Sequence, residues 1–177
     1  KAVPNVVLPK VNVITAIPED ISPTEATQND KNVGLLSLKM NTDKTSGKVD
    51  AVTLTRTGSS NDSDIDLIKI WQDSNDNCIF DSVDKSTDAS GTYPNLMSYG
   101  NESYSKGSVT IALKKPLTVT TSPACFFVSY DISQFATVGK DMGLRVEGSS
   151  NFAIAIPNSI ALSTWPVNTS LIRVKEI

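Results

Sequence analysis

The chain contains no histidine. Histidine is the commonest general base near neutral pH and a frequent zinc ligand, so its absence excludes Ser-His and Cys-His nucleophile pairs and the usual zinc sites. Paired carboxylates would remain for catalysis, but nothing in the sequence brings two of the 19 Asp and Glu residues together. We therefore expect that the protein is not an enzyme.

Long hydrophobic runs and basic clusters are also missing. No apolar stretch approaches the roughly 20 residues that a transmembrane helix needs, so we expect no membrane insertion. The net charge is −3, and no basic cluster appears beyond Lys114-Lys115, so nucleic acid is not an expected partner. The sequence starts at Lys1 without a methionine, which suggests a processed, exported chain or a piece of a longer one.

What the sequence does contain is a series of short stretches in which apolar and polar residues alternate. Leu36, Leu38 and Met40 would share one face of a strand, and the clearest alternation runs from residue 109 to residue 117. The run from Ile65 to Trp71 is apolar on both faces, which is typical of a central strand. Together with later runs up to residue 174, the pattern predicts eight to ten short strands and no long helix. We expect an all-β protein, an antiparallel β-sandwich.

The length of 177 residues suits one domain. The β-rich segment from Val6 to Ile14 contains Pro9, and proline cannot donate to a β-ladder, so this segment should lie at a sheet edge or between neighbouring molecules. We therefore predict an amino-terminal extension over residues 1–20 and a sandwich domain over residues 21–177.

The most informative motif is an oxygen-rich loop directly after the run that ends near Trp71. Oxygen donors recur at its first, third, fifth, ninth and twelfth positions, and the seventh would supply a backbone carbonyl, as in a twelve-residue calcium loop. The predicted calcium ligands are Asp73, Asn75, Asn77, Ile79 (by its carbonyl), Asp81 and Asp84. The sixth position carries Cys78 where a sharp turn favours glycine, and the flanks are not helical, so the site would differ from an EF-hand. The alternative is a polar turn in which Asp and Asn cap their own backbone.

The order of these segments resembles a known class of module. The segments that carry the resemblance are residues 32–38, 52–58, 64–73, 126–133, 136–139 and 143–146. They are similar to the immunoglobulin-like β-sandwich modules repeated in large secreted and surface-anchored prokaryotic proteins, which often carry an Asp/Asn loop after a strand ending in an aromatic residue and aspartate. The resemblance covers roughly residues 32–147. It implies an extracellular or cell-surface location and a structural or adhesive role in a longer array.

Two cysteines and one aspartate have two interpretations each. Cys78 and Cys125 are either ordinary small core residues or, as an even count and the extracellular resemblance favour, a disulfide that joins the loop to a strand. Asp131 either caps the turn through Ser133 and Phe135, which we favour, or approaches the loop as a further ligand.

Three tyrosines follow the predicted calcium loop. Tyr93, Tyr99 and Tyr104 could stack on a glycan or contact a protein partner, or could pack back onto the sandwich. The sequence therefore predicts a non-catalytic, calcium-stabilised extracellular module. It would be a building block of a surface array, sheath or filament, with neighbouring copies as partners. The alternative is an adhesive module that binds carbohydrate or protein.

Overall fold

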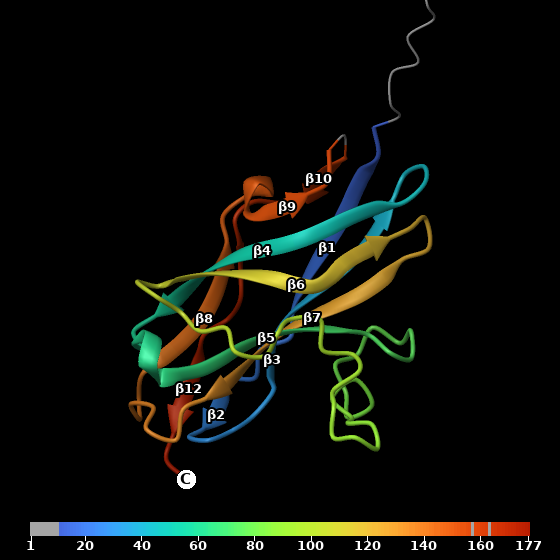
Figure 1. The fold of residues 1–177 in the computed structure, drawn as a ribbon. Helices are drawn as coiled ribbons and strands as arrows, with labels where there is room; N and C mark the ends of the chain where they lie inside the picture. The colour runs from blue at the N-terminus through green and yellow to red at the C-terminus, as the bar shows by residue number, and fades with distance from the viewer. Residues whose placement is uncertain (1–10, 157, 163) are drawn as a thin grey trace, which may run out of the picture.

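The structure is a computed structural model that describes residues 11–156, 158–162 and 164–177. Two β-sheets pack face to face (Figure 1). The strands are β1 (Val13–Asp20), β2 (Glu25–Thr27), β3 (Val33–Thr42), β4 (Gly47–Gly58), β5 (Ile65–Gln72), β6 (Ser108–Val119), β7 (Ala124–Ile132), β8 (Asp141–Val146), β9 (Phe152–Ile154), β10 (Ser159–Leu162), β11 (Val167–Asn168) and β12 (Ile172–Lys175). The helical elements are two single 3₁₀ turns, Asp62–Asp64 and Ser149–Asn151. The predicted all-β sandwich is confirmed, with twelve strands in the described residues.

The first sheet has the order β10-β1-β3-β7-β5, and the second has the order β2-β12-β8-β4-β6, with β9 beside β4 and β11 beside β8. Most neighbours are antiparallel, as expected, but β1 pairs with β10 and β2 with β12 in parallel. Parallel pairing is available here because each partner arrives from a distant part of the chain, not through a hairpin.

The amino-terminal boundary differs from the prediction. Residues 13–20 form β1, which lies between β3 and β10 inside the first sheet, and Ile14 is fully buried. These residues therefore belong to the sandwich and not to an extension. Residues 1–10, which include most of the predicted edge strand, lie outside the described part of the chain.

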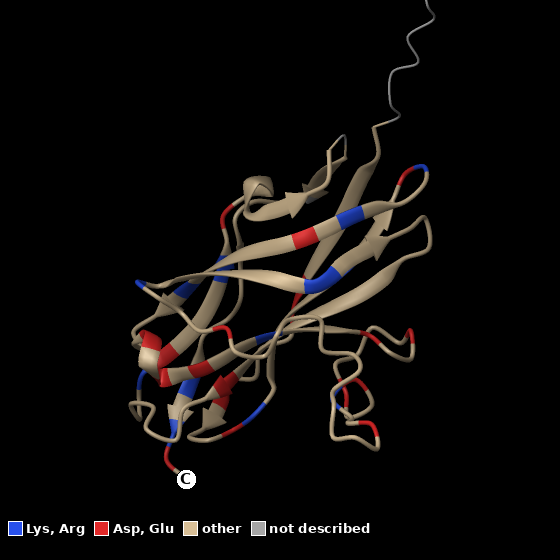
Figure 2. Ribbon diagram, in the orientation of Figure 1, with Lys and Arg blue, Asp and Glu red and all other residues tan. Residues whose placement is uncertain are grey.

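The inner faces of the two sheets form the main core. The alternation read from the sequence is confirmed at Leu36, Leu38 and Met40, which are at most 5% exposed, and at Leu54 and Ile111, which are fully buried. No helix among the described residues has the length and apolar character needed to cross a bilayer. Lysines, arginines and acids are interspersed over the strands and loops, so that neither sign of charge forms a continuous field (Figure 2).

A long loop, residues 73–107, connects β5 to β6 and leaves the body of the sandwich on one side (Figure 1). Its segment near Met97 joins the two sheets at their open edge, because the Met97 N–H donates to the carbonyl of Ile70 in β5 (2.8 Å) and the Lys114 N–H of β6 donates to the carbonyl of Met97 (2.8 Å). The loop thus covers two sheet edges that would otherwise expose unpaired backbone groups.

Strand β5 is not the central strand that its composition suggested. It is the last strand of its sheet, yet both of its faces are buried. Ile68 and Ile70 face the main core, whereas Trp71 faces outward and is covered by the long loop. Burial by a loop therefore produced the two-sided apolar pattern that we attributed to a central position.

Candidate functional site

The predicted calcium loop begins where β5 leaves the sheet. Asp73 is still attached to the neighbouring strand, since its N–H donates to the carbonyl of Cys125 in β7 (3.0 Å), and its side chain is buried. The residues after it turn away from the sheet and are mostly exposed. Strand pairing therefore fixes the first predicted ligand, and the rest of the loop extends from this fixed point.

The oxygens at the first, third and fifth positions make the same local contact. The Oδ1 atoms of Asp73, Asn75 and Asn77 each accept the N–H two residues further on, at 3.2, 3.3 and 2.7 Å. Oδ1 of Asp81 accepts the Val83 N–H in the same way (2.8 Å). These are successive Asx turns, in which a short polar side chain caps its own backbone. The two-residue spacing of these side chains, which suggested metal ligands, is therefore also the spacing that caps the local backbone.

Asp84, the twelfth residue of the loop, is fully buried and ties the beginning of the loop to its end. Its Oδ1 accepts the N–H and the hydroxyl of Ser74 (2.9 and 3.0 Å), and its Oδ2 accepts the N–H of Asp81 (3.1 Å). A buried carboxylate is tolerated only with such partners. Asp84 therefore closes the loop whether or not an ion is bound.

The disulfide between Cys78 and Cys125 is formed, with a Cα–Cα distance of 5.3 Å. This confirms the cross-link and excludes two free thiols. Cys78 has a φ of +57°, in the left-handed region that normally favours glycine, and its N–H donates to Oδ2 of Asp73 (2.7 Å). The cysteine at the glycine position therefore adopts the backbone conformation of a glycine, and the disulfide fixes it to β7.

The donor set of the loop is chemically suited to calcium, but its carboxylates do not converge. Among the Asp, Glu and Cys residues that the structure describes, the one group of three with ligand atoms within 4.8 Å of one another is Asp73 with the two cysteines, whose sulfurs are in the disulfide and are not thiolate ligands. Oδ2 of Asp81 accepts from the amides of Asn77 (3.0 Å) and Asn75 (3.3 Å), and the Asn77 contact lowers the pKa of Asp81. Each of these oxygens has a second lone pair, and calcium takes oxygen ligands of this kind.

Beneath the loop lies a second, smaller hydrophobic core on the outer face of the first sheet, which we call the outer core. Trp71 and Phe127 are fully buried in it, and Phe80 and Tyr93 of the loop cover them. The ring centroids of Phe80 and Phe127 are 5.1 Å apart, and those of Tyr93 and Trp71 are 5.4 Å apart at right angles. The indole N–H of Trp71 donates to the hydroxyl of Ser129 (2.8 Å). The loop is therefore packed against the sheet by aromatic contacts as well as by the disulfide.

The three tyrosines do not form a common platform. Tyr104 is buried, and its hydroxyl lies 2.6 Å from that of Tyr130 in the main core; burial raises the pKa values of both phenols. Its assignment as a ligand residue is wrong, because its ring fills the core. Tyr93 packs on Trp71 and is half-buried, whereas Tyr99 is 60% exposed.

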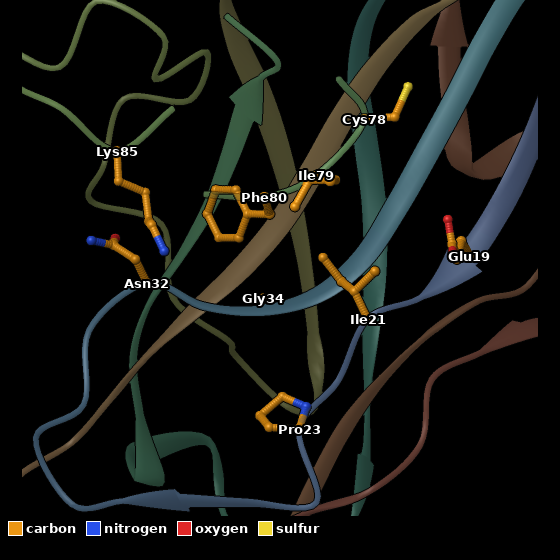
Figure 3. A pocket seen from close by; sticks show the side chains of 9 residues that line it. All are labelled: Glu19, Ile21, Pro23, Asn32, Gly34, Cys78, Ile79, Phe80 and Lys85. Carbon is orange, nitrogen blue, oxygen red and sulfur yellow. The ribbon is translucent and has the colours of Figure 1, made fainter. Parts of the chain in front are cut away.

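A groove that sequence reasoning missed lies between the loop and the first strands (Figure 3). Its volume is about 370 Å³. Ile21, Gly34 and Phe80 form its apolar part, and Lys85 and Glu19 lie on different sides of it; the Lys85 ammonium is 4.6 Å from the centroid of Phe80. No local sequence signal indicates this groove, since its lining residues come from the loop and from the first strands, which are far apart in the sequence.

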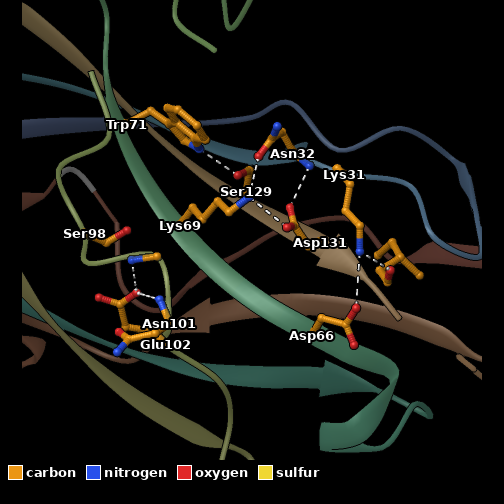
Figure 4. Close-up of polar contacts among 12 residues, drawn as sticks. Lys31, Asn32, Asp66, Lys69, Trp71, Ser98, Asn101, Glu102, Ser129 and Asp131 are labelled. Carbon is orange, nitrogen blue, oxygen red and sulfur yellow. Dashed lines mark hydrogen bonds and ion pairs between the residues drawn. The ribbon is translucent and has the colours of Figure 1, made fainter. Parts of the chain in front are cut away.

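A buried polar cluster occupies the same outer face of the sheet (Figure 4). Nζ of Lys69 in β5 is 2.7 Å from Oδ2 of Asp131 in β7 and 2.9 Å from Oδ1 of Asn32, just before β3. Oδ1 of Asp131 accepts the backbone N–H of Asn32 (2.9 Å). The expectation that Asp131 caps the following turn or binds the metal is wrong. The partner of Asp131 is a buried lysine. The turn is capped by Ser133, whose hydroxyl oxygen accepts the N–H of Phe135 (3.3 Å).

Comparison of the chain with models of protein families and with curated protein sequences finds no match. The assignment of function below therefore depends on the fold and on the contacts described above.

Proposed function

We propose that this protein is a non-catalytic extracellular structural module, a building block of a surface array, sheath or filament, whose long loop is stabilised by calcium. The observation that carries the proposal is the covalently fixed loop: the Cys78–Cys125 disulfide joins an oxygen-rich loop to β7 of the first sheet. Disulfides persist in oxidising compartments, which supports an extracellular location. Such reinforcement suits a part that bears load.

The path of the chain also suits a linear array. The described chain enters the sandwich near the start of β1 and leaves it at the opposite end, after β12 (Figure 1). Modules with ends on opposite sides can follow one another along an axis without the chain doubling back. Assembly through residues 1–10 would be tested by deleting them and comparing sedimentation of the two forms. A folded variant that assembles as the full chain does would count against a role of this segment.

The calcium proposal rests on the spacing and chemistry of the donors. An ion that binds only the folded state at 100 times its Kd adds about 2.7 kcal/mol of stability, which for a chain of this size corresponds to roughly 5–10 °C in Tm. We expect such a rise in calcium relative to chelator. Asp81→Ala should abolish the rise, whereas Asp88→Ala should retain it, because Asp88 makes an Asx contact with Ser90 in the same long loop but lies outside the twelve residues.

Isothermal titration calorimetry gives the direct measurement. Extracellular calcium modules bind with Kd values on the order of 10⁻⁴–10⁻³ M, so titration to about 10 mM covers the range. No heat of binding together with an unchanged Tm would reject calcium and leave the Asx turns as the whole explanation of the motif.

The groove and Tyr99 favour one alternative, an adhesive module that binds carbohydrate or protein. Tyr99 is the exposed ring of the three tyrosines, and the groove combines an apolar floor with Lys85 and Glu19. A glycan array probed with the wild type, Tyr99→Ala and Lys85→Ala separates the two functions. Selective binding that either substitution removes would support the adhesive role.

A further inference from the structure

We propose that Lys69 and Asn32 become joined by an amide bond between their side chains, with Asp131 as the acid-base group of the reaction. The three polar groups meet on the outer face of the first sheet (Figure 4). They come from β5, from the turn before β3, and from β7 between them. This inference is independent of the proposed function and of calcium.

The amine is held against its target. Lys69 is 8% exposed, and its Nζ contacts the carboxamide of Asn32 at 2.9 Å and the carboxylate of Asp131 at 2.7 Å. Asn32 is fixed by its own backbone, which has a φ of +56° and donates its N–H to Asp131. Holding two reacting groups in contact replaces a bimolecular encounter and is equivalent to effective concentrations on the order of 10⁵ M or more. A slow reaction can therefore go to completion within a folded chain.

The proton balance can be completed by the residues present. Asp131 takes the proton of the Lys69 ammonium, and the neutral amine attacks Cγ of Asn32. The Cγ–Nδ2 bond then breaks, the proton of the attacking nitrogen passes to the departing group, and ammonia leaves. The product is an amide between Nζ and Cγ beside a neutral Asp131. No oxidant, metal or other reactant is needed.

The surroundings favour this direction. Lys69 and Asp131 form a buried ion pair, and Asp131 is only 4% exposed. Burying two charges is costly even when they are paired, and the reaction replaces both by neutral groups. Asn32 lines the groove of Figure 3, so ammonia formed there has an open route to solvent.

The cross-link would complement the disulfide. The disulfide joins the long loop to β7, whereas the amide would join β5 to the start of β3 across β7. Three neighbouring strands and their covering loop would then be tied together by two covalent bonds on one face. The strands nearest the long loop could not separate without breaking a bond.

Intact mass under denaturing, reducing conditions tests the proposal. The wild type should be lighter than its sequence mass by about 17 Da, the mass of one ammonia. Asn32→Ala and Asp131→Asn should each have the full sequence mass. Lys31→Gln is the matched control, since Lys31 pairs with Asp66 at the surface close by, and it should keep the deficit. A tryptic digest should contain a branched peptide that joins residues 32–39 to a segment containing residue 69.

The wild-type measurement decides the question even if a variant fails to fold. A folded wild type at its full sequence mass would show that the cluster is only a buried ion pair and would overturn the proposal. A deficit of about 18 Da with a branch at residue 131 would mean that water is lost and Asp131 is the acceptor, which would overturn the assignment of Asn32.

Discussion

Removal of the disulfide tests how much of the fold depends on the fixed loop. Cys78 and Cys125 lie 47 residues apart, and the closed segment includes most of the long loop, β6 and the beginning of β7. In the chain-entropy account, a closed loop of this length destabilises the unfolded chain by about 4 kcal/mol. The structure indicates a second loss of folded-state stability. Without the disulfide, no covalent bond to β7 holds residue 78 at its φ of +57°, which a residue other than glycine adopts at a cost.

We therefore expect the Cys78→Ala/Cys125→Ala variant to lose about 4 kcal/mol of unfolding free energy. For a chain of this size the loss corresponds to roughly 8–16 °C in Tm. Since folded domains are stable by about 5–15 kcal/mol in total, the variant should still fold but with little reserve. Urea unfolding at equilibrium measures the difference, and reduction of the wild type gives the same comparison without a substitution.

Hydrogen exchange shows where the loss occurs. Amides of residues 74–94 should exchange much faster in the variant, because the aromatic contacts of Phe80 and Tyr93 would then have to hold this part of the loop to the sheet without the disulfide. Amides of β4 in the opposite sheet should retain protection relative to global unfolding. A loss below about 1 kcal/mol, with protection of the loop unchanged, would refute the reasoning and show that the outer core alone fixes the loop.

Two further predictions concern the sandwich itself. Gly58 has a φ of +91°, and a Cβ there would lie 2.3 Å from the carbonyl oxygen of Asp141. Gly58→Ala should therefore lower the free energy of unfolding, measured in urea, by more than about 2 kcal/mol. The control is Gly91→Ala, where φ is also positive but the space is open, and it should cost about 1 kcal/mol. The pKa of the Asp62 carboxyl is lowered by a hydrogen bond from the Gly107 N–H and by the adjacent Arg56 guanidinium. The stabilisation that the ionised Asp62 contributes should be present at neutral pH. It should be lost as the pH falls from the ordinary pKa of an aspartate through the lowered pKa of Asp62. Asp62→Asn should therefore remove up to about 1 kcal/mol at neutral pH and flatten the acid limb of the stability profile, and an unchanged limb would contradict this role.

The main core was predictable because it depends on local alternation. Leu36, Leu38 and Met40 face inward for the reason that their spacing indicated, since successive side chains of a strand point to opposite faces. The disulfide was predictable from an even cysteine count and the resemblance. The strand faces can be read from a few adjacent residues, and the disulfide can be read from the number of cysteines.

The outer core was not predictable, because its partners are far apart in the sequence. Trp71 resembles a residue of a central strand until a loop is seen to cover it. Lys69 and Asp131 are 62 positions apart, and each looks like an exposed polar residue within its own strand. Tyr104 seemed to belong to a surface loop, yet its ring fills the space next to Tyr130. Periodicity shows which residues share a face but not what covers that face.

The two outer faces of the sandwich are therefore unequal, and the difference bears on how the module would carry load. The outer face of the second sheet carries exposed or half-exposed side chains along β4 and β6, such as the Thr53–Thr110 hydroxyl pair at 2.9 Å. The first sheet has the disulfide, the aromatic contacts and the Lys69 cluster on its outer face. Force applied along the chain enters through β1 and leaves through β12, which lie in different sheets. The disulfide and the proposed Lys69–Asn32 amide both lie on the first sheet, so with both bonds present the two sheets should separate from each other before β3, β7 and β5 do.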